Sequence, residues 1–394
     1  MAFSFLEFFA GGGMAAVGLG ANWQCQFAND IDEIKAAAYR ANHGGKELVV
    51  KDVRLLQASG LPGHADLAWA SFPCQDLSLA GAGAGLDGQR SGTFWAFWQL
   101  MRKLDEEKRA PRIIALENVY GALTSNGGRD LATIGSAFAG RGYRFGAFVI
   151  NAEQFVPQSR PRLFVVAVRK DVHIPRSIQS AGSQDNHPAA LELSRSQMPP
   201  SVLGKWIWWH LPSPAKRTVG LTALVEMKPE GVSWHTPDET QYILGLMNPL
   251  NRKKVEKAGL LKRPVVGTIY RRTRRDEGGA RVQRAEVRFD DVAGCLRTPA
   301  GGSSRQTIII VNGGDMRSRL LSPREAARLM GLPDSYKLPG RYNDAYHLLG
   351  DGVVAPVVRH IAKHVFEPLL EKQPSRLAPI AEDLFSGVRR WRKA

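Results

Sequence analysis

The sequence predicts an α/β protein built on a doubly wound, mostly parallel seven-stranded sheet. Along the first part of the chain, short apolar runs alternate with segments whose apolar residues recur at helical spacing. This is the pattern of strands and helices in turn. Glycines follow the first apolar run, and Cys, Asp or Glu stands after several others. Sheets of this class place reacting and binding groups at the carboxyl ends of their strands.

The expected elements follow this alternation. Strands are expected at 3–9, 25–28, 48–50, 66–70, 112–116, 145–150 and 163–168, and helices at 14–19, 32–42, 94–104 and 131–139. No helical segment separates the last two strands, so we expect them to pair antiparallel at an edge of the sheet. Later in the chain, Ser322 and Glu325 form a capping box that begins a helix, and a last helix is expected at 353–364.

The composition changes near Val172. Segment 177–200 is rich in Ser, Gln and Pro, which predicts a linker or loop. Several tryptophans follow, and they are expected in a core rather than as base-stacking platforms. We expect a catalytic and ligand-binding domain at 1–171, a smaller irregular domain at 172–311, a return to the first domain at 312–372, and a basic tail at 373–394.

The charge balance indicates a polyanionic partner. Lys and Arg number 53 against 37 Asp and Glu, a formal net charge of +16. Nucleic acid is the first candidate partner and an anionic membrane the second, while a generally basic solvated surface is the plain alternative. Arginines gather at 271–275 and in the tail at 389–393, which favours nucleic acid.

The cysteines and the apolar runs indicate the compartment. Cys25, Cys74 and Cys295 lie far apart, which argues against a disulfide framework and a zinc site. No apolar run is long enough to span a bilayer, and the N-terminus does not have the form of a secretion signal. A cytoplasmic protein is expected.

Two stretches can carry chemistry. Segment 71–78 follows the expected fourth strand, and Pro73 ends that strand so that Cys74 opens a loop. Cys74 there is either a catalytic nucleophile or a buried, inert thiol. The glycines at 10–13 follow the first strand, and Asp30 ends the second. This pair suits a ribose-bearing cofactor, although a glycine cluster is often only a tight turn.

Motifs along most of the chain resemble the DNA (cytosine-5)-methyltransferase family. They are Phe9–Gly13, Pro73-Cys74-Gln75, Glu117-Asn118-Val119, Gln158 to Arg162, Arg297-Thr298, and Ser322 to Pro333 with Gly350 to Val353. Met14, Leu77 and Asp351 depart from the family's usual Gly, Phe and Asn. The Asp351 departure puts the cofactor contacts at that position in doubt.

The resemblance implies a class I, Rossmann-like methyltransferase that uses S-adenosyl-L-methionine and no metal. It would methylate carbon 5 of a cytosine flipped out of double-stranded DNA, through a covalent adduct of Cys74. Glu117 would meet the ring at N3 and the amine, Asn118 would brace the Cys74 loop, and Arg162, with Arg160 nearby, would hold the ring carbonyl. The two arginines can equally be salt-bridged strand residues. No motif identifies the base, water or side chain, that removes the carbon-5 proton.

The resemblance also implies binding residues. Those for the cofactor are Phe9, Ala10, Gly11, Gly13, Asp30, Ile31, Asp52, Val53, Pro73, Asp351 and Gly352. Those for DNA are Gln75, Ser78, Gln89, Arg90, Gln158, Arg271, Arg272, Arg274, Arg275 and Arg297. Segment 80–91 is expected to be a glycine-rich closing loop or an ordinary surface turn. Segment 172–311 would be the target-recognition domain.

Because the chain begins at the first motif, we expect a single-module bacterial or phage modification enzyme, monomeric, with a possible companion restriction endonuclease. Three other readings stay open. An RNA cytosine-5 methyltransferase of the same family is the nearest. A catalytically silent nucleic-acid-binding protein would lack any need for Cys74, Glu117 and Arg162. A nicotinamide oxidoreductase would share the glycines and Asp30 but leave the Cys74 and Glu117 loops unexplained.

Overall fold

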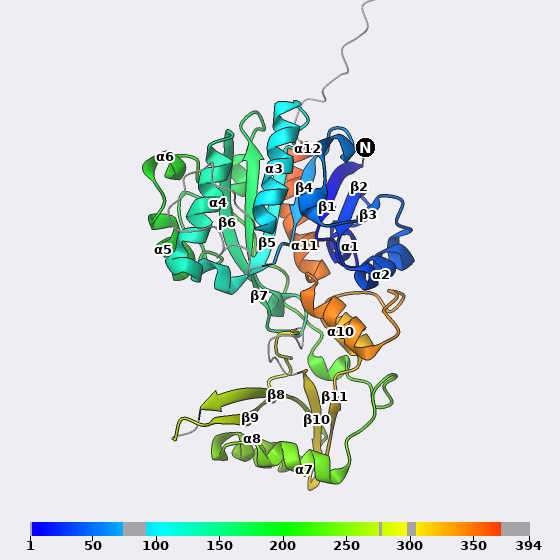
Figure 1. Ribbon diagram of the computed structural model, residues 1–394. Helices are drawn as coiled ribbons and strands as arrows, with labels where there is room; N and C mark the ends of the chain where they lie inside the picture. Colours follow the sequence, from blue (N-terminus) through cyan, green and yellow to red (C-terminus); the bar gives the residue numbers. More distant parts are fainter. Residues whose placement is uncertain (1, 74–91, 276–277, 298–304, 372–394) are drawn as a thin grey trace, which may run out of the picture.

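The computed structural model describes residues 2–73, 92–275, 278–297 and 305–371. Two lobes are visible in Figure 1, each built on its own sheet. The larger contains a seven-stranded sheet and the smaller a four-stranded sheet. None of the helices formed by these residues is both long and apolar enough to cross a membrane.

The large sheet confirms the predicted doubly wound, mostly parallel arrangement. Its strand order is β3-β2-β1-β4-β5-β7-β6. The strands are β1 (Phe3–Phe8), β2 (Trp23–Asp30), β3 (Leu48–Val50), β4 (Leu67–Ala70), β5 (Ile113–Val119), β6 (Tyr143–Asn151) and β7 (Pro161–Arg169). β6 and β7 pair antiparallel as expected, but β7 inserts between β5 and β6 and runs antiparallel to both. The reversed strand is therefore one position in from the edge.

Helices cover both faces of this sheet because its central strands are apolar on both sides. Residues of α3 (Thr93–Glu106) and α4 (Arg129–Ala139) share one core with Leu6 and Leu116. Residues of α1 (Met14–Leu19), α11 (Ala355–Ile361) and α12 (Glu367–Glu371) share the other with Phe5 and Ala115. α2 (Glu33–His43) packs Tyr39 against Ala28 of β2. α9 (Pro323–Leu329) and α10 (Tyr342–Asp351) lead back from the small lobe.

The sequence predicts an irregular small lobe, but this lobe contains an antiparallel sheet. Its strand order is β11-β10-β8-β9. Its elements are β8 (Val265–Arg275), β9 (Arg281–Arg288), β10 (Thr307–Asn312), β11 (Asp315–Leu320), α7 (Pro237–Gly245) and α8 (Pro249–Gly259). Ile269 and Val287 pack with α7 and α8 on one face. On β10, Ile308 and Ile310 join the large-lobe core instead. The other face of the small sheet is therefore turned toward the large lobe.

The segment predicted as a linker is largely packed. It contains α5 (Ala189–Ser196), and α6 (Pro200–Leu203) follows. Leu191 and Met198 are buried in the core that α3 and α4 form, and Trp209 in the other core, as expected for a core tryptophan. The four predicted regions stay a prediction, but the packing favours placing 172–211 with the large lobe. It also favours placing 312–320 with the small one, because β11 pairs with β10.

A buried ion pair joins the two lobes where β11 meets α9. The guanidinium of Arg319 donates to both carboxylate oxygens of Glu325, at 2.6 and 2.8 Å, and both side chains are almost fully buried. Glu325 also accepts from the backbone N–H groups of Ser322 and Glu226. The predicted capping box at Ser322 is confirmed. Both carboxylate oxygens of Glu325 thus accept hydrogen bonds from Arg319 and from the backbone, so Glu325 stabilises the junction of the two lobes.

We expect Glu325→Gln to lower the free energy of unfolding by about 3–5 kcal/mol, since Arg319 would be left buried without its counter-charge. The midpoint of urea unfolding measures this change. Asp334→Asn, which breaks the exposed ion pair of Asp334 with Arg328, is the matched control and should change the midpoint little. Equal effects of the two substitutions would contradict the assignment.

Candidate active site and nucleic-acid interface

A cavity of about 490 Å³ lies at the edge of the large sheet where β1, β2, β4 and β5 end. β7 runs the opposite way, so its beginning reaches the same edge. The cavity collects most of the predicted site residues, namely Phe9, Ala10, Gly11, Asp30, Ile31, Pro73, Glu117, Asn118, Arg160, Arg162, Asp351 and Gly352. Parallel topology thus brings distant sequence motifs into one chamber.

The predicted nucleophile, Cys74, lies outside the described residues, as do Gln75, Ser78, Gln89 and Arg90. The chain leading to Cys74 is described as far as Pro73, which lines the cavity. The side-chain amide of Asn118 donates to the carbonyl of Phe72 at 3.1 Å. Asn118 therefore holds the backbone two residues before Cys74.

Glu117 and Arg162 face each other in the cavity. The Arg162 Nε lies 3.2 Å from a carboxylate oxygen of Glu117, and both side chains are largely buried. The antiparallel register pairs Val119 with Arg162. An acceptor and a cationic donor thus stand side by side, a pair able to hydrogen-bond a flat polar ring along one edge.

Arg160 is a structural clamp. Its side chain is 2% exposed, and its guanidinium donates to the carbonyls of Leu296, Gly350 and Gly352 at 2.7 to 2.8 Å. Burial, with the repulsion of Arg162 next, lowers the pKa of Arg160 to about 10. It borders the cavity, but both of its terminal nitrogens donate to protein acceptors. The salt bridge left open from sequence is therefore not found for Arg160 among the described residues, where its acceptors are backbone carbonyls instead.

The glycine turn is held by Asp30. Gly11 N–H donates to one carboxylate oxygen of Asp30 at 2.7 Å, and Asp32 N–H to the other at 2.9 Å. Phe9, expected in the strand, instead adopts a left-handed φ of 58°, so β1 ends one residue early. A Cβ at Gly11 would meet no atom within 4 Å, so the cavity is open above this turn.

Of the remaining predicted cofactor residues, some line the cavity and others do not. Ile31 lines the cavity with 65% of its surface exposed, as an apolar platform would. Asp351 makes an ion pair with Lys35 at 2.7 Å on the cavity wall. Gly13 is the N-cap of α1 and does not line the cavity. Asp52 is bonded to Arg54 instead, and Val53 is buried in the core, so neither lines the cavity.

Sequence reasoning missed Glu7, an acid on β1 that lines the cavity at 1% exposure. Its Oε2 has no hydrogen-bond partner among the described residues. Burial raises the pKa of Glu7 to about 8, against an opposing hydrogen bond from the backbone of Ala16. A charged residue inside an otherwise apolar strand was the signal available.

The predicted DNA-binding arginines lie on opposite faces of the small sheet. Ile269 points to the helices, so Tyr270, Arg272 and Arg274 point to the large lobe, whereas Arg271 and Arg275 follow the helix face. Arg284 of β9, which the sequence prediction omitted, lies directly opposite Arg272. Both are exposed. Like charges at directly paired positions destabilise a bare sheet, which is typical of a surface that meets a polyanion.

Gln158 is a correction to the predicted DNA contacts. It is fully buried, and its amide donates to the carbonyl of Leu329 and accepts from Leu296 N–H. Its polar atoms are thus used between the lobes. Arg297, by contrast, is exposed and lies beside Tyr270, 5.9 Å from its ring centre.

Comparison with known proteins identifies the family. Residues 3–367 match the family described as C-5 cytosine-specific DNA methylase. The chain belongs to this family. The methylase family uses S-adenosylmethionine, and the residues present fit such a cofactor. The open turn at Gly11, the exposed face of Ile31 and the unpartnered oxygen of Glu7 all face the cavity.

Relatives of this methylase span nearly its full length. The chain is 26% identical to Type II methyltransferase M.HhaI of Haemophilus parahaemolyticus, covering 92% of this chain and 93% of the relative. It is 27% identical to Type II methyltransferase M.NlaX of Neisseria lactamica, over 92% and 96%. An Entamoeba histolytica methyltransferase structure shares the fold, with a TM-score of 0.58 and 15% identity over 94% of this chain and 99% of that one.

We expect the stability of this methylase to fall as pH rises from about 4.5 to about 8, relative to Glu7→Gln. The pKa of Glu7 is about 8 in the folded chain against 4.5 ordinarily. In that window the folded state keeps a proton that the unfolded state has lost, so raising the pH favours unfolding. Urea unfolding of both proteins across the window measures the difference.

Glu33→Gln, at an exposed carboxyl, is the control and should keep the wild-type profile. Parallel pH profiles for wild type and Glu7→Gln would show that Glu7 is not held neutral.

Proposed function

We propose that this methylase transfers a methyl group to carbon 5 of a cytosine flipped out of double-stranded DNA, with the Cys74 thiolate as nucleophile. The observation that carries the proposal is the facing pair of Glu117 and Arg162, which shares a cavity with the glycine turn and with Pro73. This pair can hold a cytosine by its polar edge. Pro73, which lines this cavity, directly precedes Cys74 in the sequence.

Carbon 5 of cytosine is a weak nucleophile until a group adds at carbon 6. Addition of the Cys74 thiolate there makes carbon 5 electron-rich, and it then takes the methyl group. Loss of the carbon-5 proton lets the carbon–sulfur bond break, which restores the ring and the thiolate. Glu117, as a protonated carboxylic acid, would donate to N3 and accept from the exocyclic amine, and Arg162 would donate to the ring carbonyl. Asn118, which donates to the carbonyl of Phe72, would brace the chain that leads to Cys74.

S-adenosylmethionine, bound in the cavity, would supply an electrophilic methyl on its sulfonium. The backbone of Phe9, Ala10 and Gly11 would surround its methionine part. Ile31 offers an exposed apolar face for the adenine. Asp30 would accept from a ribose hydroxyl while it holds Gly11 in place. Asp351 and Gly352 form the opposite wall, where Lys35 balances the Asp351 charge.

DNA would lie between the lobes, against the face of the small sheet that carries Arg272, Arg274 and Arg284. These side chains are exposed. Along each strand they alternate with residues on the face that packs against the helices. Glu286 offsets part of their positive charge, because its carboxylate forms an ion pair with the guanidinium of Arg274 at 2.9 Å. A monomeric, cytoplasmic modification enzyme, with or without a companion endonuclease, fits this arrangement.

We expect purified protein to form an adduct stable in denaturing gels with duplex DNA that contains 5-fluorocytosine in its target site. Fluorine at carbon 5 cannot leave as the proton does, so the carbon–sulfur bond persists. Cys74→Ala should form no adduct, and Glu117→Gln should form it about 10² to 10⁴ times more slowly. Mass spectrometry of the cross-linked peptide locates the sulfur.

Two matched cysteine variants sharpen this experiment. Burial raises the pKa of Cys25 to about 12, so Cys25→Ala should keep the adduct. Cys295 is the stricter control: although burial opposes ionisation, Arg160, Arg162 and Arg297 lower its pKa below the ordinary value. Cys295→Ala should also keep the adduct. An adduct that survives Cys74→Ala but disappears with Cys295→Ala would move the nucleophile to Cys295.

We also expect the double variant Arg272→Ala/Arg284→Ala to weaken DNA binding and its salt dependence. Each lost phosphate contact should reduce the slope of log K against log salt by about 0.9. Arg275→Ala/Arg281→Ala removes a directly paired set from the other face and should change the slope less. Fluorescence anisotropy across salt concentrations measures both. The reverse ranking would place the DNA on the helix side.

A further inference from the structure

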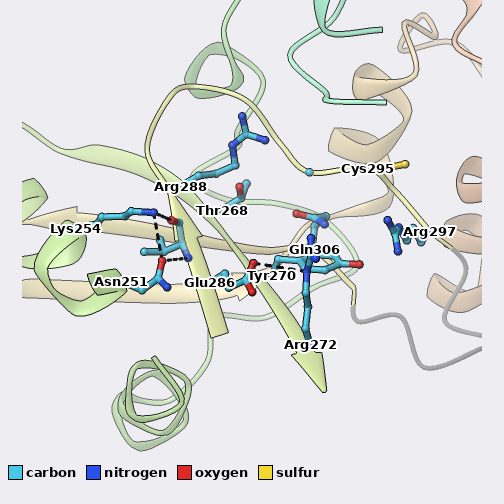
Figure 2. Close-up of a pocket in the computed structure, with 12 residues that line it drawn as sticks. Asn251, Lys254, Thr268, Tyr270, Arg272, Glu286, Arg288, Cys295, Arg297 and Gln306 are labelled. Carbon is cyan, nitrogen blue, oxygen red and sulfur yellow. Dashed lines mark hydrogen bonds and ion pairs between the residues drawn. The ribbon is translucent and has the colours of Figure 1, made fainter. Parts of the chain in front are cut away.

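A second cavity, of about 340 Å³, lies on the face of the small sheet that is turned toward the large lobe. Figure 2 shows the residues that line it, among them Tyr270, Arg272, Glu286, Cys295, Arg297 and Gln306. Tyr270 and Arg272 point into it from β8, and Gln306 lies just before β10. The volume is within the range of pockets that hold small ligands, about 300–1,000 Å³.

Gln306 is the feature of this cavity that needs an explanation. Its side chain is 1% exposed, and neither its amide oxygen nor its amide nitrogen has a hydrogen-bond partner among the described residues. A buried amide without partners is destabilising, because its polar atoms have lost water and gained no hydrogen bond in exchange. Its backbone is fixed, because Gln306 N–H donates to the Tyr346 hydroxyl and its carbonyl accepts from Leu321 N–H. The amide therefore extends from a fixed backbone and has no partner within the described residues.

The surroundings of Gln306 indicate a nucleic-acid ligand. Arg272 and Arg297 lie 4.7 and 5.9 Å from the ring centre of Tyr270. Lys254 adds positive charge to the lining, whereas Arg288 is paired with Asp290 and Glu286 offsets part of the remaining charge. Cationic groups around an aromatic ring suit a nucleotide, whose base is flat and whose phosphates are anionic. Gly294 leaves room for the amide, since a Cβ there would come within 3.0 Å of Gln306 Nε2.

The cavity adjoins the active site. Cys295 lines it, and the Cys295 sulfur lies 3.5 Å from the guanidinium of Arg160, which borders the catalytic cavity. The carbonyl of the next residue, Leu296, accepts from the same guanidinium at 2.7 Å. A DNA strand whose cytosine occupies the catalytic cavity would therefore pass this second cavity with neighbouring nucleotides.

We propose that this cavity reads one adenine of the recognition sequence, and that the Gln306 amide bonds its N6 and N7. This inference rests on the proposed function, because it takes DNA as the substrate. An amide presents one acceptor and one donor side by side, and in the major groove adenine is the base whose edge matches both. Gln306 is thus a specificity-determining residue.

The test is selection of bound duplexes from a pool randomised around a central cytosine, with S-adenosylhomocysteine present so that no chemistry is required. Wild-type protein should enrich a sequence that contains an adenine. Gln306→Ala should lose that preference by about 5- to 150-fold, the discrimination of one bidentate pair, while the other positions stay selected. Gln241→Ala, at an exposed glutamine on α7, is the matched control and should select as wild type does.

Gly294→Ala provides a second variant in case Gln306→Ala does not fold, because it displaces the amide without removing it. It should weaken the same adenine position. Unchanged selection, uniform loss at all positions, or loss at a position other than an A·T pair would overturn the inference. Methyl transfer to the selected duplexes is measured separately. Its absence in wild type would count against the proposed function, while the selection still decides the role of Gln306.

Discussion

The buried guanidinium of Arg160 holds together the parts that make the site. Its bonds to Leu296, Gly350 and Gly352 join the start of β7 to the chain near the small lobe and to the end of α10. A buried cation is tolerated only where its donors find acceptors, so the three backbone segments must keep this spacing. The flat, forked guanidinium can reach separate carbonyls at once, which an ammonium on a flexible stem does less well.

The end of β5 also joins separate parts of the site, through two adjacent side chains. β5 lies between β4 and β7. Glu117 turns to Arg162 of β7, and Asn118 turns to the chain that follows β4 at Phe72. Both residues lie at the carboxyl end of β5, and each side chain reaches the chain on a different side of this strand. One strand therefore carries both the group that would hold the base and the group that bonds Phe72, two residues before Cys74.

Much of the large lobe can be predicted from sequence because buried parallel strands read as apolar runs. Both β3 and α1 have the bounds that the pattern predicts. β8 and β9 are not predicted in this way, because arginines, glutamine and glutamate occupy many of their positions. The apolar pattern is therefore lost where the strands extend beyond the core. Composition likewise misleads for α5, whose Leu191 is buried although the flanking sequence resembles a linker.

The candidate site, too, can be predicted only in part from the sequence. Motifs identify Glu117, Asn118 and Arg162, and the topology then brings them to one cavity. Motifs do not reveal that Gln158 and Arg160 bond the backbone, because those partners come from residues over 100 positions away. Asp52 shows a local effect: its neighbour Arg54 takes up the carboxylate that the pattern assigns to a cofactor. Local sequence indicates which groups exist, whereas distant contacts decide which of them are available.

The left-handed backbone of Phe9 bears on how a ligand would enter. A bulky residue held at a positive φ costs on the order of 1–3 kcal/mol, so the surrounding fold must enforce it. Asp30 does so by holding Gly11 two residues on. The turn thus has its shape before any ligand arrives, and its ordering belongs to folding rather than to association. Such preorganisation leaves little loop entropy to lose on binding and suits repeated, rapid exchange of a small molecule.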